Sequence, residues 1–169
     1  ARILNTTQTH KDIRLGDSIT AEMQVTNTIN MGIGFDTWTT VLPRLWAVHS
    51  VFPTHVHIML GVNDLHTTHG SDAISRIIDS ATTAINYIRH TVNCSITIYS
   101  VINNEAHMRN KVWQFNEGLE VLARKINIKF VAIKNLTKRH FIDDNIHLSE
   151  TGNRYVKHVM FGAPPRMLF

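Results

Sequence analysis

The sequence is poor in cysteine, proline and glycine: its 169 residues include one cysteine, Cys94, four prolines and eight glycines. A single cysteine excludes an intrachain disulfide and any metal site built from several cysteines. No apolar run approaches the roughly 20 residues that a helix needs to cross a bilayer, so we expect no membrane insertion. Because the chain also lacks repeats and Pro/Gly-rich linkers, residues 1–169 are expected to form one domain with its own core.

The start of the sequence indicates no cellular location. The chain begins at Ala1 rather than at methionine, and its first ten residues are polar and lack the apolar stretch of a signal peptide. The localisation therefore stays open, secreted and virion-associated locations included, and the domain is compatible with being part of a longer polypeptide.

Acidic residues are slightly outnumbered, since 13 Asp and Glu stand against 17 Lys and Arg and give a formal net charge of +4. This mild excess fits ordinary solubility and equally fits attraction to an anionic partner. Basic residues concentrate in the last third of the chain, at Arg124, Lys125, Lys129, Lys134, Lys138, Arg139 and His140. We interpret them first as a solvated face. The sharper alternative is binding of nucleic acid or an acidic polysaccharide, which would weaken with salt.

Apolar residues at steps of three and four predict amphipathic helices over residues 71–91 and 108–126. A shorter helix is predicted around Trp38–Leu45, with Pro43 in its first turns, and an amphipathic segment over Asn153–Met160 closes the series. Runs rich in β-branched residues predict five strands, over residues 13–15, 29–33, 56–60, 96–102 and 128–133. Strands alternating with helices predict an α/β fold with a parallel sheet, whose sites lie at the carboxyl ends of the strands.

A serine follows the first predicted strand in the segment Gly16-Asp17-Ser18. Such a turn presents a hydroxyl at the start of a helix, where free backbone N–H groups and the helix dipole favour developing negative charge. Taken alone, however, the segment is better explained as a helix N-cap.

Two further motifs follow later strands. Gly61-Val62-Asn63-Asp64 places on a strand-end loop an amide that can donate a hydrogen bond to an oxyanion, although an Asx turn explains it equally well. Asp144 lies three residues before His147 on a loop ahead of the last helix. A serine nucleophile needs an imidazole to accept its proton and a carboxylate to hold that imidazole's tautomer. Alone, this loop is equally a solvated surface segment.

In combination these motifs resemble the SGNH/GDSL hydrolase family. The resemblance is carried by Gly16-Asp17-Ser18, Asn30-Met31-Gly32-Ile33-Gly34, Gly61-Val62-Asn63-Asp64 and Asp144-x-x-His147, and it spans residues 14–160. It implies a three-layer α/β/α fold with a flavodoxin-like five-stranded parallel sheet. It also implies ester hydrolysis through an acyl-enzyme, without a metal or another cofactor.

The resemblance also assigns roles to residues. Ser18 would be the nucleophile, His147 the base and Asp144 its orienting partner, while the Ser18 N–H and the Asn63 side chain would contribute to the oxyanion hole. The segment from Gly32 to Asp36 is most similar to members related to platelet-activating-factor acetylhydrolase α subunits and to bacterial or phage carbohydrate esterases.

One position departs from the pattern of those members. Where they carry a glycine whose backbone N–H contributes to the oxyanion hole, this sequence has Phe35, directly before Asp36. With phenylalanine at this position the backbone N–H remains available if the φ of Phe35 is negative, whereas a positive φ would strain its backbone. Phe35 could alternatively line the acyl pocket and shrink it toward acetyl. Gly34 and Trp38 are the other candidates for substrate contact, although packing in the core or beside the pocket is the simpler interpretation of Trp38.

The leading hypothesis is a serine ester hydrolase that removes a small acyl group, acetyl, from a carbohydrate, either a small molecule or a polysaccharide. The alternatives are a lipid-directed hydrolase of the lysophospholipase or phospholipid-acetylhydrolase kind, a binding module without turnover, and a nucleic-acid-associated domain. The pairs His55/His57 and His66/His69 suggest a metal site, but a closed site needs further ligands, so we expect none. The sequence leaves the oligomeric state open.

Overall fold

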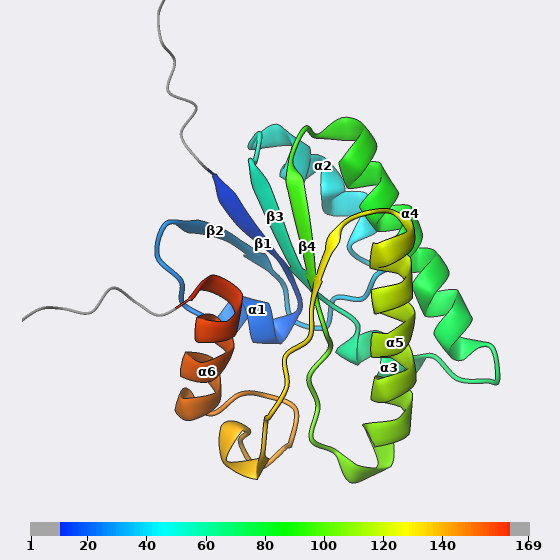
Figure 1. Ribbon diagram of the computed structural model, residues 1–169, viewed down its shortest axis with the longest axis vertical. Coiled ribbons are helices and arrows are strands. Elements are labelled where there is room, and N and C mark those ends of the chain that lie inside the picture. The colour runs from blue at the N-terminus through cyan, green and yellow to red at the C-terminus, as the bar shows by residue number, and fades with distance from the viewer. Residues whose placement is uncertain (1–10, 163–169) are drawn as a thin grey trace, which may run out of the picture.

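A computed structural model describes residues 11–162, which form a five-stranded parallel sheet with helices on both faces (Figure 1). The strands are β1 (Asp12–Gly16), β2 (Thr28–Gly32), β3 (His55–Met59), β4 (Ser95–Tyr99) and β5 (Lys129–Val131). Their order across the sheet is β2-β1-β3-β4-β5. This is the flavodoxin-like order, and it confirms the predicted three-layer α/β/α fold.

Helices cover the two faces of the sheet unequally. They are α1 (Ser18–Glu22), α2 (Leu45–Ser50), α3 (Val62–Thr67), α4 (Ala73–Thr91), α5 (Arg109–Lys125) and α6 (Glu150–Phe161), with short 3-10 helices η1 (Leu42–Arg44), η2 (Ala106–Met108) and η3 (Lys138–His140). The long helices α4 and α5 pack side by side on one face, with α2 against α4, while α1 and α6 lie on the other face (Figure 1).

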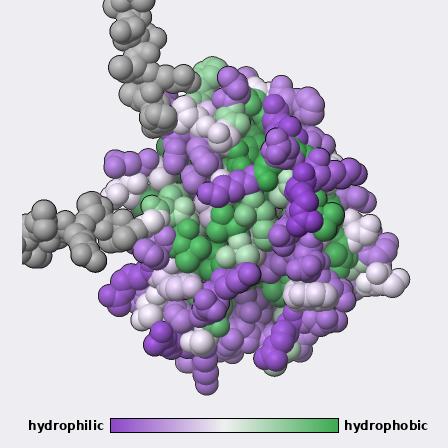
Figure 2. Space-filling view, in the orientation of Figure 1, coloured by the Kyte–Doolittle hydropathy of each residue, from purple (hydrophilic) through white to green (hydrophobic). Residues whose placement is uncertain are grey.

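The two faces of the central strands differ in polarity. Arg14 points toward α1, where its guanidinium donates a hydrogen bond to the Met23 carbonyl at 2.6 Å, so its neighbours Ile13 and Leu15 face the α4 and α5 side. Both neighbours are fully buried there. On the α1 and α6 side His57 of β3 packs edge-on against Phe161, with ring centroids 4.8 Å apart. In the view of Figure 2, hydrophilic residues surround apolar residues gathered near the centre of the molecule.

Two local predictions were wrong. The short helix expected at Trp38–Leu45 is instead η1 followed by α2 at Leu45–Ser50, because Pro43 lacks an N–H and is accommodated only where a helical segment begins. Asn63 lies in the first turn of α3 rather than on a loop. Gly61, at φ 137°, reverses the chain after β3, and the helix starts with the next residue.

No helix within residues 11–162 is both long enough and apolar enough to cross a membrane.

Candidate active site

Ser18 is the first residue of α1, directly after β1, at the carboxyl edge of the sheet. Asp17 caps the helix, since its Oδ1 accepts the N–H of Ile19 at 3.0 Å. Gly16 is required before this turn, because a Cβ there would lie 2.4 Å from the Met59 carbonyl oxygen. The sharp turn from strand to helix therefore presents the Ser18 hydroxyl at the sheet edge.

Side chains from β1 and β2 hold the other end of α1. Asn30 Nδ2 donates to the carbonyls of Thr20 and Ala21 at 3.1 and 3.0 Å, and the buried Arg14 donates to that of Met23. These bonds satisfy carbonyls that a helix end leaves without partners. Asn30, part of the second motif, thus fixes the helix that carries Ser18. Arg14 has the same role and was not predicted, although a charged residue within a central parallel strand is a signal for it.

Ser18, His147 and Asp144 form one hydrogen-bonded relay. Ser18 Oγ lies 2.8 Å from His147 Nε2, and His147 Nδ1 lies 2.6 Å from Asp144 Oδ2. An ionised carboxylate only accepts hydrogen bonds, so it places the ring proton on Nδ1 and leaves Nε2 free to accept from the serine hydroxyl. The arrangement can deprotonate the hydroxyl during attack on a carbonyl carbon.

The loop before α6 keeps Asp144 ionised. Asp144 Oδ1 accepts the backbone N–H groups of Ile146 and His147 at 2.8 and 2.9 Å. Partial burial acts to raise the pKa of Asp144, but these two bonds and the bond from the His147 ring hold it below its ordinary value. The carboxylate therefore remains charged at neutral pH.

Asn104 and Asn145 connect this loop to the segment that follows β4. Asn104 donates its N–H to the Asn145 carbonyl at 2.8 Å and its Nδ2 to the Asn145 side-chain oxygen at 2.9 Å. Asn145 has a left-handed backbone, with φ 60°, and lies between Asp144 and His147. This pair was not predicted from the sequence, because two isolated asparagines 41 positions apart carry no pattern that marks them.

A second loop contact reaches α3. His66 Nε2 lies 2.7 Å from Oε2 of Glu105, the residue that directly follows Asn104. Asn103 also donates a hydrogen bond to the Glu105 carboxylate. Burial acts to raise the pKa of Glu105, but the bonds from Asn103 and His66 hold it below its ordinary value. The charged carboxylate thus ties the helix of Asn63 to the segment that supports the Asp144 loop.

Phe35 and Asn63 meet at one turn beside Ser18. Residues 33–36 form a β-turn in which the Asp36 N–H donates to the Ile33 carbonyl at 3.2 Å. The Ile33 N–H donates to Gly16 O at 3.0 Å, and Asn63 Nδ2 donates to Asp36 O at 3.0 Å. Because an amide group has two N–H donors, Asn63 retains a second one for an oxyanion.

Phe35 occupies the third position of this turn with φ 65°, in the left-handed region. This geometry suits glycine and costs other residues of the order of 1–2 kcal/mol. The turn is nevertheless well fixed, since the Asp36 carboxylate forms an ion pair with Arg44 and accepts a hydrogen bond from Thr40. The strain anticipated for a positive φ at Phe35 is therefore present, and the residue is 89% exposed.

The two proposed pocket residues differ in position. Gly34 is exposed, with open space where a Cβ would project. Trp38 is fully buried; its Nε1 donates to the Leu60 carbonyl at 3.0 Å and its backbone N–H to Asp64. The prediction that Trp38 contacts substrate was wrong, because the indole is packed inside the core.

Two buried carboxyl groups flank the site. Burial raises the pKa of Asp17 to about 7, against the Ile19 N–H bond and the charge of His147, which act to lower it. Burial also raises the pKa of Asp64 to about 6. Both groups are therefore protonated over part of the range between pH 4 and 7, where an exposed aspartate is charged.

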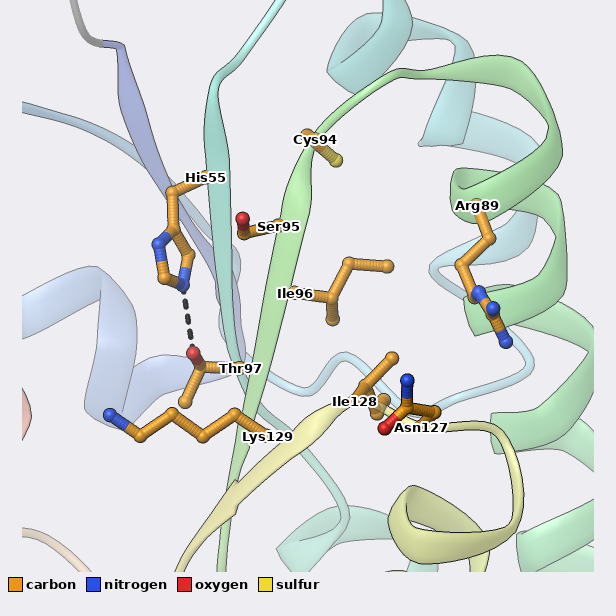
Figure 3. Close-up of a pocket in the computed structure, with 9 residues that line it drawn as sticks. All are labelled: His55, Arg89, Cys94, Ser95, Ile96, Thr97, Asn127, Ile128 and Lys129. Atoms are coloured by element: carbon orange, nitrogen blue, oxygen red, sulfur yellow. Dashed lines mark hydrogen bonds between the residues drawn. The ribbon is translucent and has the colours of Figure 1, made fainter.

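Two cavities lie at the opposite edge of the sheet. One, of about 440 Å³, is lined by His55, Ser95 and Lys129, the first residues of β3, β4 and β5 (Figure 3). The other, of about 600 Å³, lies between residues 24–28 and the end of α6. Ser18 follows the carboxyl end of β1, and neither cavity is lined by Ser18, Asp144 or His147.

His57 and His140, which the sequence marked as part of a candidate metal site and of a basic run, make local contacts within the fold. His57 Nε2 lies 3.1 Å from Asp12, and its Nδ1 lies 2.8 Å from the Tyr99 hydroxyl. Among residues 11–162 no group of three or more His, Cys, Asp or Glu could hold a metal ion. His140, counted with the basic run, is buried, and its Nδ1 accepts the N–H of Thr137.

Several solved structures share the fold. A catalytic mutant of an acetylxylan esterase from Geobacillus stearothermophilus is 17% identical, with a TM-score of 0.74 over 90% of this chain and 92% of its own. A GDSL-like lipase from Bacteroides thetaiotaomicron is 18% identical, with a TM-score of 0.74 over 89% and 85% of the two chains. An alpha/beta hydrolase enzyme from the metagenome of Lake Arreo, Spain, is 14% identical, with a TM-score of 0.73 over 90% and 93%.

A comparison with curated proteins finds no match. Residues 14–155, however, match the sequence profile of the GDSL-like lipase/acylhydrolase family. The matched segment includes Ser18, Asn63, Asp144 and His147 and covers most of the chain. The chain therefore belongs to the GDSL-like lipase/acylhydrolase family and is a carboxylic ester hydrolase.

Proposed function

We propose that this hydrolase cleaves acetyl esters of carbohydrates, with Ser18 as nucleophile, His147 as general base and Asp144 as the group that orients the imidazole. The observation that carries the catalytic assignment is the continuous relay of 2.8 Å from Ser18 to His147 and 2.6 Å from His147 to Asp144. It joins groups of the types, and in the order, that serine nucleophiles require.

The reaction proceeds in two steps. Ser18 Oγ attacks the ester carbonyl carbon as its proton passes to His147 Nε2, and the imidazolium returns that proton to the leaving alcohol. Water then attacks the acyl-enzyme with the same imidazole as base. The backbone N–H groups of Ser18 and Phe35 and the Asn63 amide are assigned to the oxyanion.

One observation supports acetyl and a carbohydrate as the substrate: the fold resembles that of an acetylxylan esterase. A lipid ester is the second candidate, favoured by exposed apolar side chains near the site: Ile33 and Ile142 are both 50% exposed and Phe35 is 89% exposed.

Hydrolysis of a p-nitrophenyl ester series from acetate to octanoate tests both assignments. Ser18→Ala should lower kcat by several orders of magnitude, since the triad acts as a unit. The matched control is Ser50→Ala, at an exposed serine that ends α2 and donates only to the Trp46 carbonyl. Equal activity in Ser18→Ala and the wild type would refute the catalytic assignment. A preference for octanoate over acetate would refute the small acyl group and favour the lipid ester.

A further inference from the structure

Phe35 combines two features that do not stabilise the folded protein. The residue is 89% exposed to water, and its backbone has a φ of 65°, which glycine would adopt without strain. Backbone strain at a functional site persists where the surrounding structure fixes it and can be part of the function. The position of the ring therefore matters more than its contribution to folding.

The backbone that carries this ring is held on both sides by the catalytic elements. The turn is bonded to Gly16, two residues before Ser18, through the Ile33 N–H at 3.0 Å, and to Asn63 through the Asp36 carbonyl at 3.0 Å. The ion pair between Arg44 and Asp36 also fixes this turn. Phe35 is thus a rigidly mounted, solvent-facing aromatic side chain next to the nucleophile and the oxyanion amide, as a binding platform requires.

The chemistry of the site decides which part of an ester this ring can meet. The carbonyl oxygen points to the donors at Ser18 and Asn63, and a small acyl group stays against the protein beside them. The alcohol part must leave toward solvent, and it is the part large enough to reach a ring that is itself in solvent. If Phe35 lined the acyl pocket, its ring would instead have to be buried within the protein beside the acyl group.

We infer that Phe35 is a specificity-determining residue that packs its ring against a flat, partly apolar face of the alcohol part of the substrate, such as the face of a pyranose ring. This inference rests on the proposed function. It replaces the interpretation that Phe35 narrows the acyl pocket.

Phe52 shows that a left-handed phenylalanine alone does not mark a site. It has a φ of 49° and is 71% exposed, but it precedes β3 at the amino edge of the sheet, and its ring lies 5.8 Å from that of His49. Phe35 differs from it in its attachment to the catalytic elements. Phe52 is therefore the matched control for strain, exposure and residue type.

Two acetate esters with different alcohols test the platform: ethyl acetate, whose alcohol is too short to cover a phenyl ring, and a methyl pyranoside monoacetate. Phe35→Ala should lower kcat/KM for the pyranoside acetate between about 2-fold and 10-fold more than for ethyl acetate, through KM, as expected for loss of one ring contact. Phe35→Tyr, which keeps the aromatic face, should retain the wild-type ratio of the two substrates. Phe52→Ala should change neither substrate.

Every other outcome refutes either the role of the Phe35 ring or the proposed function. Equal losses for both esters in Phe35→Ala, or a lost ratio in Phe35→Tyr, would refute the platform. A change in the ratio of ethyl acetate to ethyl butyrate would place the ring on the acyl side and refute it too. Phe35→Leu, which keeps apolar bulk without an aromatic face, provides the same comparison if the alanine variant does not fold. Absence of wild-type activity on both acetates would refute the proposed function itself, whereas activity with an unchanged ratio refutes only the platform.

Discussion

Replacing Asp17 by asparagine should flatten the pH dependence of stability without moving Ser18. Asp17 is 1% exposed and caps α1 by accepting the Ile19 N–H, a bond that an asparagine oxygen can also accept. Burial raises the pKa of Asp17 from 3.8 to about 7 in the folded chain. The folded state therefore holds this proton more tightly than the unfolded state does.

The sign and size of the effect follow from linkage. Between pH 4 and 7 the folded chain binds more protons at Asp17, so the free energy of unfolding falls as pH rises through this window. A pKa difference of about 3 corresponds to a loss of about 4 kcal/mol between acid and neutral pH. Asp64, with a pKa of about 6, contributes a smaller loss in the same direction.

Urea unfolding at about pH 4 and about pH 8 measures the effect. The wild type should lose up to about 4 kcal/mol more than Asp17→Asn across this interval, whatever the absolute stability of the variant. Asp79→Asn, at an exposed carboxylate on α4, is the control and should keep the wild-type slope. If Asp17→Asn and the wild type showed the same slope, the burial of the Asp17 carboxyl would be refuted as the cause of the pH dependence.

Three further predictions concern catalysis. Asp144→Asn should lower kcat about 10⁴-fold with little change in KM, because the wrong His147 tautomer then faces the serine, and steady-state kinetics measures this. Asn63→Ala should lower kcat about 10²–10³-fold through loss of an oxyanion donor, and an unchanged kcat would remove Asn63 from the oxyanion hole. Asn104→Ala should lower kcat about 10-fold, and Asn145→Gly at least as much, because it also removes the bond from Asn145 Nδ2 to the Asp143 carbonyl; the double variant should lose no more than Asn145→Gly alone, and additive losses would show independent roles.

The sequence predicted the layers of the fold because each layer has a local signature. The stripes over residues 71–91 and 108–126 mark the faces that α4 and α5 bury, and each of the five β-branched runs overlaps one strand, although the runs 96–102 and 128–133 extend beyond β4 and β5. Ser18, Asn63, Asp144 and His147 were singled out as candidates because each lies near the end of a strand or the start of a helix. Their spatial convergence was predicted by the family resemblance and by the rule that parallel strands end at one edge.

What escaped prediction depends on contacts between distant residues. The sequence near the second motif left Trp38 open between core packing and substrate contact, and the buried indole settles it through acceptors on distant residues, Leu60 and Asp64, for both of its N–H groups. The positive φ of Phe35 follows from the turn that Asp36 closes against Arg44, and a local preference for that conformation would favour glycine instead. Neither acceptor geometry nor turn type is encoded within a short window of sequence.

The proposed catalytic groups differ in how they are attached to the fold, and this difference predicts separate effects of damage to each attachment. Ser18 and Asn63 lie on helices that start directly after β1 and β3, so their positions depend on the packed sheet. Asp144 and His147 lie on a loop whose link to the segment that follows β4 is the amide pair of Asn104 and Asn145. Damage to the sheet should therefore abolish folding and activity together. Damage to the amide pair should slow proton transfer to His147 while leaving substrate binding and the oxyanion donors in place, so kcat should fall with KM nearly constant.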